Sequence, residues 1–201
     1  MGTDGSIVGE ELVLVDVDAW RAWLVVNDDV SDGVWLRLAK RGTVTPTSLN
    51  YADALDEALC SGWIDGQRRS FDATTFHQRF TPRRARSIWS QRNVGHVARL
   101  VEQGRMRPRG QREVDRAAAD GRLDRAYAGS ADAVVPDDLA AALDAEPEAR
   151  RRFEASNAQE RYHVLVQLMT ASNETTRARR LERLVRGLAD APTQLADIRQ
   201  L

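Results

Sequence analysis

The chain has 201 residues, of which 42% are hydrophobic and 29% are charged, and its formal net charge is −1. This composition is typical of a globular protein and excludes a chain that is disordered over most of its length. No stretch approaches the roughly 18 uninterrupted apolar residues of a membrane-spanning helix, and the N-terminal stretch lacks the features of an export signal. We therefore expect a cytoplasmic protein.

Charge is unevenly distributed along the chain. Residues 1–60 carry 11 acidic and 4 basic side chains, whereas residues 61–116 carry 5 acidic and 13 basic ones. A basic segment with interleaved aromatic residues can bind nucleic acid. Because the whole chain is close to neutral, we predict no nucleic-acid partner.

The first third of the sequence predicts strands and helices in alternation. In the second predicted strand, apolar residues recur at every second position after a turn at Asp32-Gly33, which is the period of a half-buried strand. Asp16 or Asp18 can cap the first helix, and Gly62 can end the second. The predicted elements are a strand at 11–15, a helix at 16–27, a strand within 31–42 and a helix from 51 to 61.

Two further strands follow, within 63–72 and 74–84, and we expect them to form a hairpin. From Asn93 onward the apolar spacing predicts only helices, with stops at Gly104 and Gly121. The later helices are predicted at 137–145, 147–155, 158–171 and 174–189. Asn157 and Glu160 form a near match to a capping box.

The predicted fold class is therefore α+β: a small antiparallel sheet with helices, followed by a helical C-terminal segment. The predicted domains are an α+β domain at 1–128, a linker at 129–136 and a helical module at 137–201.

Arginines gather where the second hairpin strand ends. Arg79, Arg83 and Arg84 lie close to Ser87 and Trp89 in the sequence. Guanidinium groups at a strand-to-helix junction can hold a phosphate or carboxylate, and the indole can stack on a planar ligand. In the alternative interpretation, the arginines cover a solvated edge and the tryptophan is part of the core.

Asp65 is an acidic residue within a predicted strand, where an acid is uncommon unless it pairs, caps or has a function. It can form a salt bridge to Arg83 or Arg84, or act as a general base or as an anchor for a ligand amine. The single cysteine, Cys60, lies beside apolar residues and is better explained as a small buried residue than as a nucleophile.

The sequence contains no Cys/His metal motif, no HExxH, no GxSxG, no Walker A and no GxGxxG. We therefore predict no metal and no cofactor.

Several segments, taken in order, resemble the YdeI/OmpD-associated family, also labelled bacteriocin-protection proteins. They are WRAWL (20–24), DGVWLRLAKRG (32–42), YADALDEALCSGWIDGQ (51–67), QRFTPRRARSIWS (78–90), NVGHVARLVEQGRMRPRG (93–110) and ETTRARRL (174–181). The resemblance implies a small α+β domain followed by a helical module, and a link with tolerance of bacteriocins or cationic antimicrobial peptides.

These observations favour a ligand-binding protein of a resistance or stress-protection type. Its pocket would be bordered by Trp63, Asp65 and Gln67 on one strand and by Arg79, Arg83, Arg84, Ser87 and Trp89 after it, and its partner would be a small-molecule or antimicrobial ligand. The alternative is an enzyme of isomerase, cyclase or hydrolase type without metal or nucleotide, in which Asp65 is the acid or base. A third possibility is a partner-binding module acting through the C-terminal helices.

Overall fold

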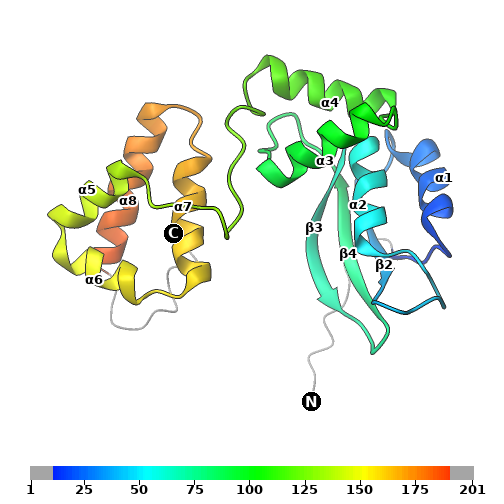
Figure 1. Cartoon of the computed structure of the whole chain (residues 1–201), viewed down its shortest axis with the longest axis horizontal. Helices are drawn as coiled ribbons and strands as arrows, with labels where there is room; N and C mark the ends of the chain where they lie inside the picture. Colours follow the sequence, from blue (N-terminus) through cyan, green and yellow to red (C-terminus); the bar gives the residue numbers. More distant parts are fainter. Residues whose placement is uncertain (1–10, 191–201) are drawn as a thin grey trace. The chain divides into compact units, whose positions relative to one another are not determined.

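The computed structural model describes residues 11–190, which form two compact units (Figure 1). The first unit contains residues 11–87 and 93–121, and the second contains residues 88–92 and 122–190. The outer ends of the predicted domains, 1–10 and 191–201, lie outside the described residues. Within 11–190, no helix is long and apolar enough to cross a membrane.

The sheet of the first unit has four strands in the order β1-β2-β4-β3. They are β1 (Glu11–Leu12), β2 (Val34–Ala39), β3 (Trp63–Ser70) and β4 (Thr75–Pro82). β3 and β4 form the predicted hairpin, and β4 also pairs antiparallel with β2. The α+β class is confirmed. The sheet is mixed, because β1 runs parallel to β2.

Four helices accompany this sheet: α1 (Val17–Asn27), α2 (Tyr51–Cys60), α3 (Gln91–Glu102) and α4 (Pro108–Ala119). The predicted cap of α1 is confirmed, since the Asp16 side chain accepts a hydrogen bond from the N–H of Ala19 at 2.9 Å. The glycines predicted to end α2, α3 and α4 all have positive φ, the conformation that a helix C-terminus favours in glycine.

The core of the first unit lies between α1, α2 and one face of the sheet. The ring of Trp20 on α1 lies 6.3 Å from the ring of Trp63 and 5.7 Å from that of Phe80, both on strands. Such offset and edge contacts between aromatic rings add to the stabilisation from burial.

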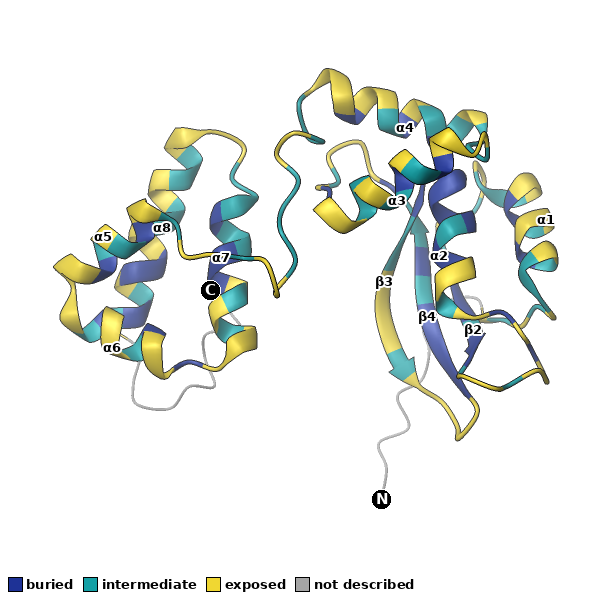
Figure 2. Ribbon diagram, in the orientation of Figure 1, coloured by how far each residue is buried: buried dark blue, intermediate teal, exposed yellow. Residues whose placement is uncertain are grey.

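The opposite face of β2 is also buried, so the prediction of a half-buried strand is wrong (Figure 2). Trp35 on that face is only 3% exposed. The guanidinium of Arg69 lies over the Trp35 ring at 4.7 Å, and that of Arg37 lies over the Phe71 ring at 3.8 Å. Long arginine side chains thus shield aromatic rings on a face that the sequence pattern presents as polar.

The second unit contains α5 (Asp137–Ala145), α6 (Pro147–Ala155), α7 (Ala158–Met169) and α8 (Glu174–Asp190), close to the predicted bounds. The capping box predicted for α7 is confirmed, with both the Asn157 and Glu160 side chains making the expected hydrogen bonds. Apolar residues from all four helices form the core of this unit. The predicted linker, 129–136, lies within the second unit, and its role as a linker stays a prediction.

Candidate functional site

The predicted site residues on β3 have different environments. Trp63 is buried, and its indole N–H donates to the carbonyl oxygen of Asp28 at 3.0 Å. The carboxylate of Asp65 accepts a hydrogen bond from the Tyr51 hydroxyl at 2.8 Å. Gln67 is exposed, at an irregularity in the pairing of β3 with β4. Of these three residues, only Asp65 therefore combines partial exposure with a side chain oriented by a hydrogen bond.

The arginines on and after β4 do not share one surface with Trp63. Arg79 precedes Phe80, which contacts the aromatic core, so the Arg79 side chain lies on the other face of the sheet. Arg83 is buried directly after the strand, and its backbone N–H donates to the carbonyl oxygen of Gly62 at 2.9 Å. The end of β4 is thereby fixed to the end of α2.

The remaining predicted site residues lie in a turn and in the second unit. The N–H of Arg84 donates to Ser87 Oγ at 3.0 Å, and the N–H of Ser87 donates back to the carbonyl oxygen of Arg84 at 2.9 Å. Trp89 is buried and belongs to the second unit. The structure thus places Trp63 and Asp65 on one face of the sheet and Arg79 on the other, and the joint ligand-binding role of these residues stays a prediction.

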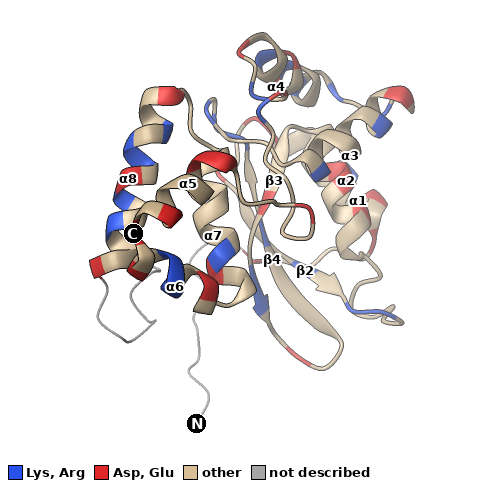
Figure 3. Ribbon diagram, turned by 60° about the vertical axis from the view of Figure 1, so that its left-hand side comes forward, with Lys and Arg blue, Asp and Glu red and all other residues tan. Residues whose placement is uncertain are grey.

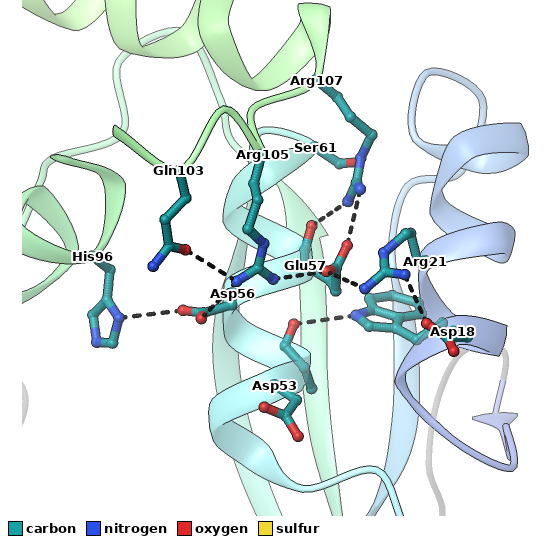
Figure 4. Close-up of polar contacts among 12 residues, drawn as sticks. Asp18, Arg21, Asp53, Asp56, Glu57, Ser61, His96, Gln103, Arg105 and Arg107 are labelled. Atoms are coloured by element: carbon teal, nitrogen blue, oxygen red, sulfur yellow. Dashed lines mark hydrogen bonds and ion pairs between the residues drawn. The ribbon is translucent and has the colours of Figure 1, made fainter. Parts of the chain in front are cut away.

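A polar cluster that the sequence analysis missed surrounds the C-terminal half of α2 (Figure 4). Its centre is Glu57, whose side chain is 1% exposed. Oε1 accepts from Arg105 at 2.8 Å and from Arg21 at 3.1 Å, while Oε2 accepts from Arg107 at 2.9 Å. A buried carboxylate needs such partners, because leaving it unpaired would carry a large desolvation penalty.

The arginines of the segment RMRPRG (105–110) surround the end of α2. Arg107 also donates to the carbonyl oxygen of Glu57 at 2.6 Å and to Ser61 Oγ at 2.7 Å, and Arg109 donates to the carbonyl oxygen of Ser61 at 3.3 Å. The last carbonyl groups of a helix lack intrahelical partners and carry partial negative charge. The segment therefore caps α2 with positive charge.

Close backbone contact completes this arrangement. The N–H of Arg107 donates to the carbonyl oxygen of Cys60 at 3.0 Å. A Cβ atom on Gly110 would lie 2.1 Å from the same oxygen, so this position in α4 requires glycine.

Asp56 extends the cluster to α3. Its carboxylate accepts two hydrogen bonds from Arg99, at 2.7 and 2.8 Å, and lies 3.3 Å from Nδ1 of His96. Arg105 approaches it at 3.6 Å. Adjacent acidic residues on α2 thus bind arginines from α1, from α3 and from the segment before α4.

The ionisation states of Glu57 and Cys60 indicate a structural role for this cluster and not a catalytic one. Burial raises the pKa of Glu57, but hydrogen bonds from Arg21, Arg107 and Arg105 outweigh it, so that the net pKa lies below its usual 4.5. Burial, together with the negative charge of Glu57, raises the pKa of the Cys60 thiol to about 11. The thiol is therefore protonated at neutral pH, in agreement with the interpretation of Cys60 as a packing residue.

No group of three or more His, Cys, Asp and Glu side chains within the described part of the chain is arranged to hold a metal ion.

The second unit has a groove of about 550 Å³ between α5 and α8. Its floor is apolar and made largely of small residues: Ala142, Ala145, Ala178, Leu181, Val185 and Ala189. Its charged members are Glu146, Glu182, Arg186 and Asp190. All the charged residues of α5 are acidic, whereas α8 carries both signs (Figure 3). Acidic groups thus outnumber basic ones at this groove.

Two family models match the chain. One, described as a domain of unknown function (DUF8412), matches residues 12–113, and the other, described as Bacteriocin-protection, YdeI or OmpD-Associated, matches residues 132–191. No curated protein and no solved structure matches. The second match confirms the family resemblance over α5–α8 and suggests a bacteriocin-protection or stress-related role. The first match covers more than half of the chain.

Proposed function

This chain belongs to the DUF8412 family, and we propose that it is a binding protein of a protective type whose ligand is a basic amphipathic peptide held by the groove between α5 and α8. The proposal narrows the stress-related role that the C-terminal family match suggests. Binding alone would protect, because a sequestered peptide is withdrawn from its target. The predicted cytoplasmic location and the absence of a cofactor stay predictions.

The observation that carries the proposal is the combination of an apolar floor with an acidic rim. Alanine side chains at Ala142, Ala145 and Ala178 leave room for larger apolar side chains of a ligand. Recognition of an amphipathic helix commonly places apolar anchors in such a groove, while its charged face meets residues of opposite sign at the edges. The acidic rim favours lysine and arginine on the ligand.

One carboxylate at the edge of the groove, that of Glu182, can bind a ligand with little loss of free energy elsewhere. Glu182 pairs with Arg186 at 2.6 Å one helical turn away, and both side chains are exposed. Exposed pairs of this kind contribute only about 0–1 kcal/mol. A cationic side chain of the peptide can therefore replace Arg186 as the partner of Glu182.

The test is a calorimetric titration of the full chain with a helical peptide that carries leucine on one face and lysine on the other. Ala178→Trp should fill the groove from an exposed position on α8 and weaken binding by about tenfold or more. Ala141→Trp, exposed on α5 and outside the groove lining, is the matched control and should leave the affinity unchanged. Equal affinities of both variants and the unaltered chain would exclude the groove as the site.

The enzyme alternative is favoured by one observation, the hydrogen bond between the Tyr51 hydroxyl and the carboxylate of Asp65. Such a bond orients a partly exposed carboxylate toward a substrate, as an acid or base requires. Gln67 and Arg84, which are both exposed, would then contact the substrate. In a screen for turnover of candidate metabolites, Asp65→Asn should remove conversion and retain binding; no conversion by the unaltered chain would remove the basis for this alternative.

A further inference from the structure

The first unit has a pocket of about 410 Å³ between the end of α1 and the start of α4. Its volume falls within the range of small-molecule sites in proteins. The residues that line it are Val25, Asp28, Asp29, Arg107, Pro108, Arg109 and Arg112. We propose that this pocket binds an organic carboxylate with an apolar body, and that the ligand carboxylate replaces Asp29 on Arg109.

A carboxylate already occupies the position assigned to the ligand. Asp29 Oδ1 lies 2.8 Å from Arg109 Nε, and its Oδ2 lies 3.9 Å from a terminal nitrogen of Arg112. The Asp29 side chain is 65% exposed, so its release into water carries little penalty. Asp29 therefore marks where an external carboxylate can bind.

Arg109 is held in place before any ligand arrives. Its side chain is mostly buried, and it donates to the carbonyl oxygen of Ser61 at 3.3 Å. A guanidinium that is already oriented loses less conformational entropy when it binds a planar anion. Behind it, Arg107 is fixed by Glu57 and Ser61 and forms a rigid wall of the pocket.

Two acidic residues, Asp28 and Asp29, and three arginines line the pocket. Arg112 is 60% exposed, and its contact with Asp29 is long, so it can turn toward a ligand. α4 begins at Pro108 with no side-chain cap and no acidic residue in its first turn, so its positive end is not neutralised from within the helix. The helix start adds to the field of the arginines but does not by itself define the site.

The apolar residues of the pocket, Val25 and Pro108, favour an apolar group on the ligand. Val25 is exposed on α1 although it is hydrophobic, and Pro108 faces the same space from the start of α4. Covering these side chains removes apolar surface from water, which small inorganic anions cannot do. The ligand class is therefore a carboxylic acid with an aliphatic or aromatic body.

The experiment is calorimetric titration of the full chain with octanoate, with acetate and 1-octanol as partial ligands. Octanoate should bind at least about tenfold more tightly than either, because only it offers both the carboxylate and the apolar body. Arg109→Gln should weaken octanoate binding by about tenfold, whereas Arg41→Gln, an exposed arginine outside the pocket, should leave it unchanged.

The Asp29→Asn variant tests directly whether the ligand carboxylate takes the place of Asp29. Because the substitution removes the competing carboxylate, it should tighten octanoate binding several-fold. Weaker binding by Asp29→Asn, 1-octanol binding as tightly as octanoate, or no octanoate binding at all would each overturn the proposal. If Arg109→Gln does not fold, Arg112→Gln replaces it, since that exposed side chain supports no core contact; unchanged affinity in that variant contradicts the proposal.

Discussion

Replacing Glu57 by glutamine should destabilise the first unit, because it removes a buried negative charge and leaves its arginine partners in place. Breaking a buried charge network by removing one partner typically costs about 3–5 kcal/mol. Here the side chains of Arg107, Arg105 and Arg21 are 17%, 35% and 46% exposed, so water can solvate two of the three arginines after the change. We therefore expect the lower end of that range, about 3 kcal/mol.

The free energy of unfolding of the first unit can be measured by urea denaturation monitored by tryptophan fluorescence, since Trp20 and Trp63 are buried in its core and Trp23 stacks on Trp20. Asp18→Asn is the matched control, because Asp18 also pairs with Arg21 but is 76% exposed. The control should change the free energy by less than about 0.5 kcal/mol. An equally small effect of Glu57→Gln would refute the argument that the cluster stabilises the fold.

Three further outcomes follow from the same region. Folding lowers the pKa of Glu57, so its contribution to the free energy of unfolding is present above pH 4.5 and is lost as the pH falls below that value. The urea midpoints of the unaltered chain and of Glu57→Gln should therefore converge in acid, and a constant difference between them would contradict this. Cys60 should react with a thiol reagent at pH 8 only as fast as the first unit unfolds, and rapid labelling of the native protein would be inconsistent with its raised pKa. Gly110→Ala should lower the melting temperature, because its added Cβ would clash with the carbonyl oxygen of Cys60. The control is Gly95→Ala within α3, where nothing lies within 4 Å of the added Cβ and where stability should rise by about 0.4–1 kcal/mol. Equal shifts of the two melting temperatures in calorimetry would contradict the packing argument.

The helices and the hairpin could be predicted from the sequence because local signals define them. Asn157 and Glu160 cap α7 within one turn, and Gly62 ends α2 with a conformation that its own lack of a Cβ permits. The parallel pairing of β1 with β2 was missed, although the two strands are joined through a helix, the kind of connection that parallel strands need. Burial of both faces of β2 was missed because the side chain that lies over the Trp35 ring is an arginine, Arg69, and not an apolar residue.

The candidate site was less predictable, for two physical reasons. Neighbouring residues on a strand point to opposite faces of the sheet, so Arg79 and Phe80 have different surroundings although they are adjacent in the sequence. The Glu57 cluster depends on arginines 48 and 50 residues further along the chain, and sequence spacing does not reveal such a pairing. The signal that could have revealed the centre of the cluster is the acidic residue Glu57 on the face of α2 that also carries Ala54 and Cys60.

The position of RMRPRG in the chain also has a consequence for synthesis. The sheet and the first helices emerge from the ribosome well before the arginines that neutralise Glu57, because Arg105 and Arg107 follow β4 by more than twenty residues. Until then, only Arg21 of the three arginines that bind Glu57 has been synthesised, so the nascent domain must either leave part of this carboxylate in water or keep the end of α2 unfolded. A fragment ending after β4 should therefore stay partly open and susceptible to proteases, although all four strands are present in it.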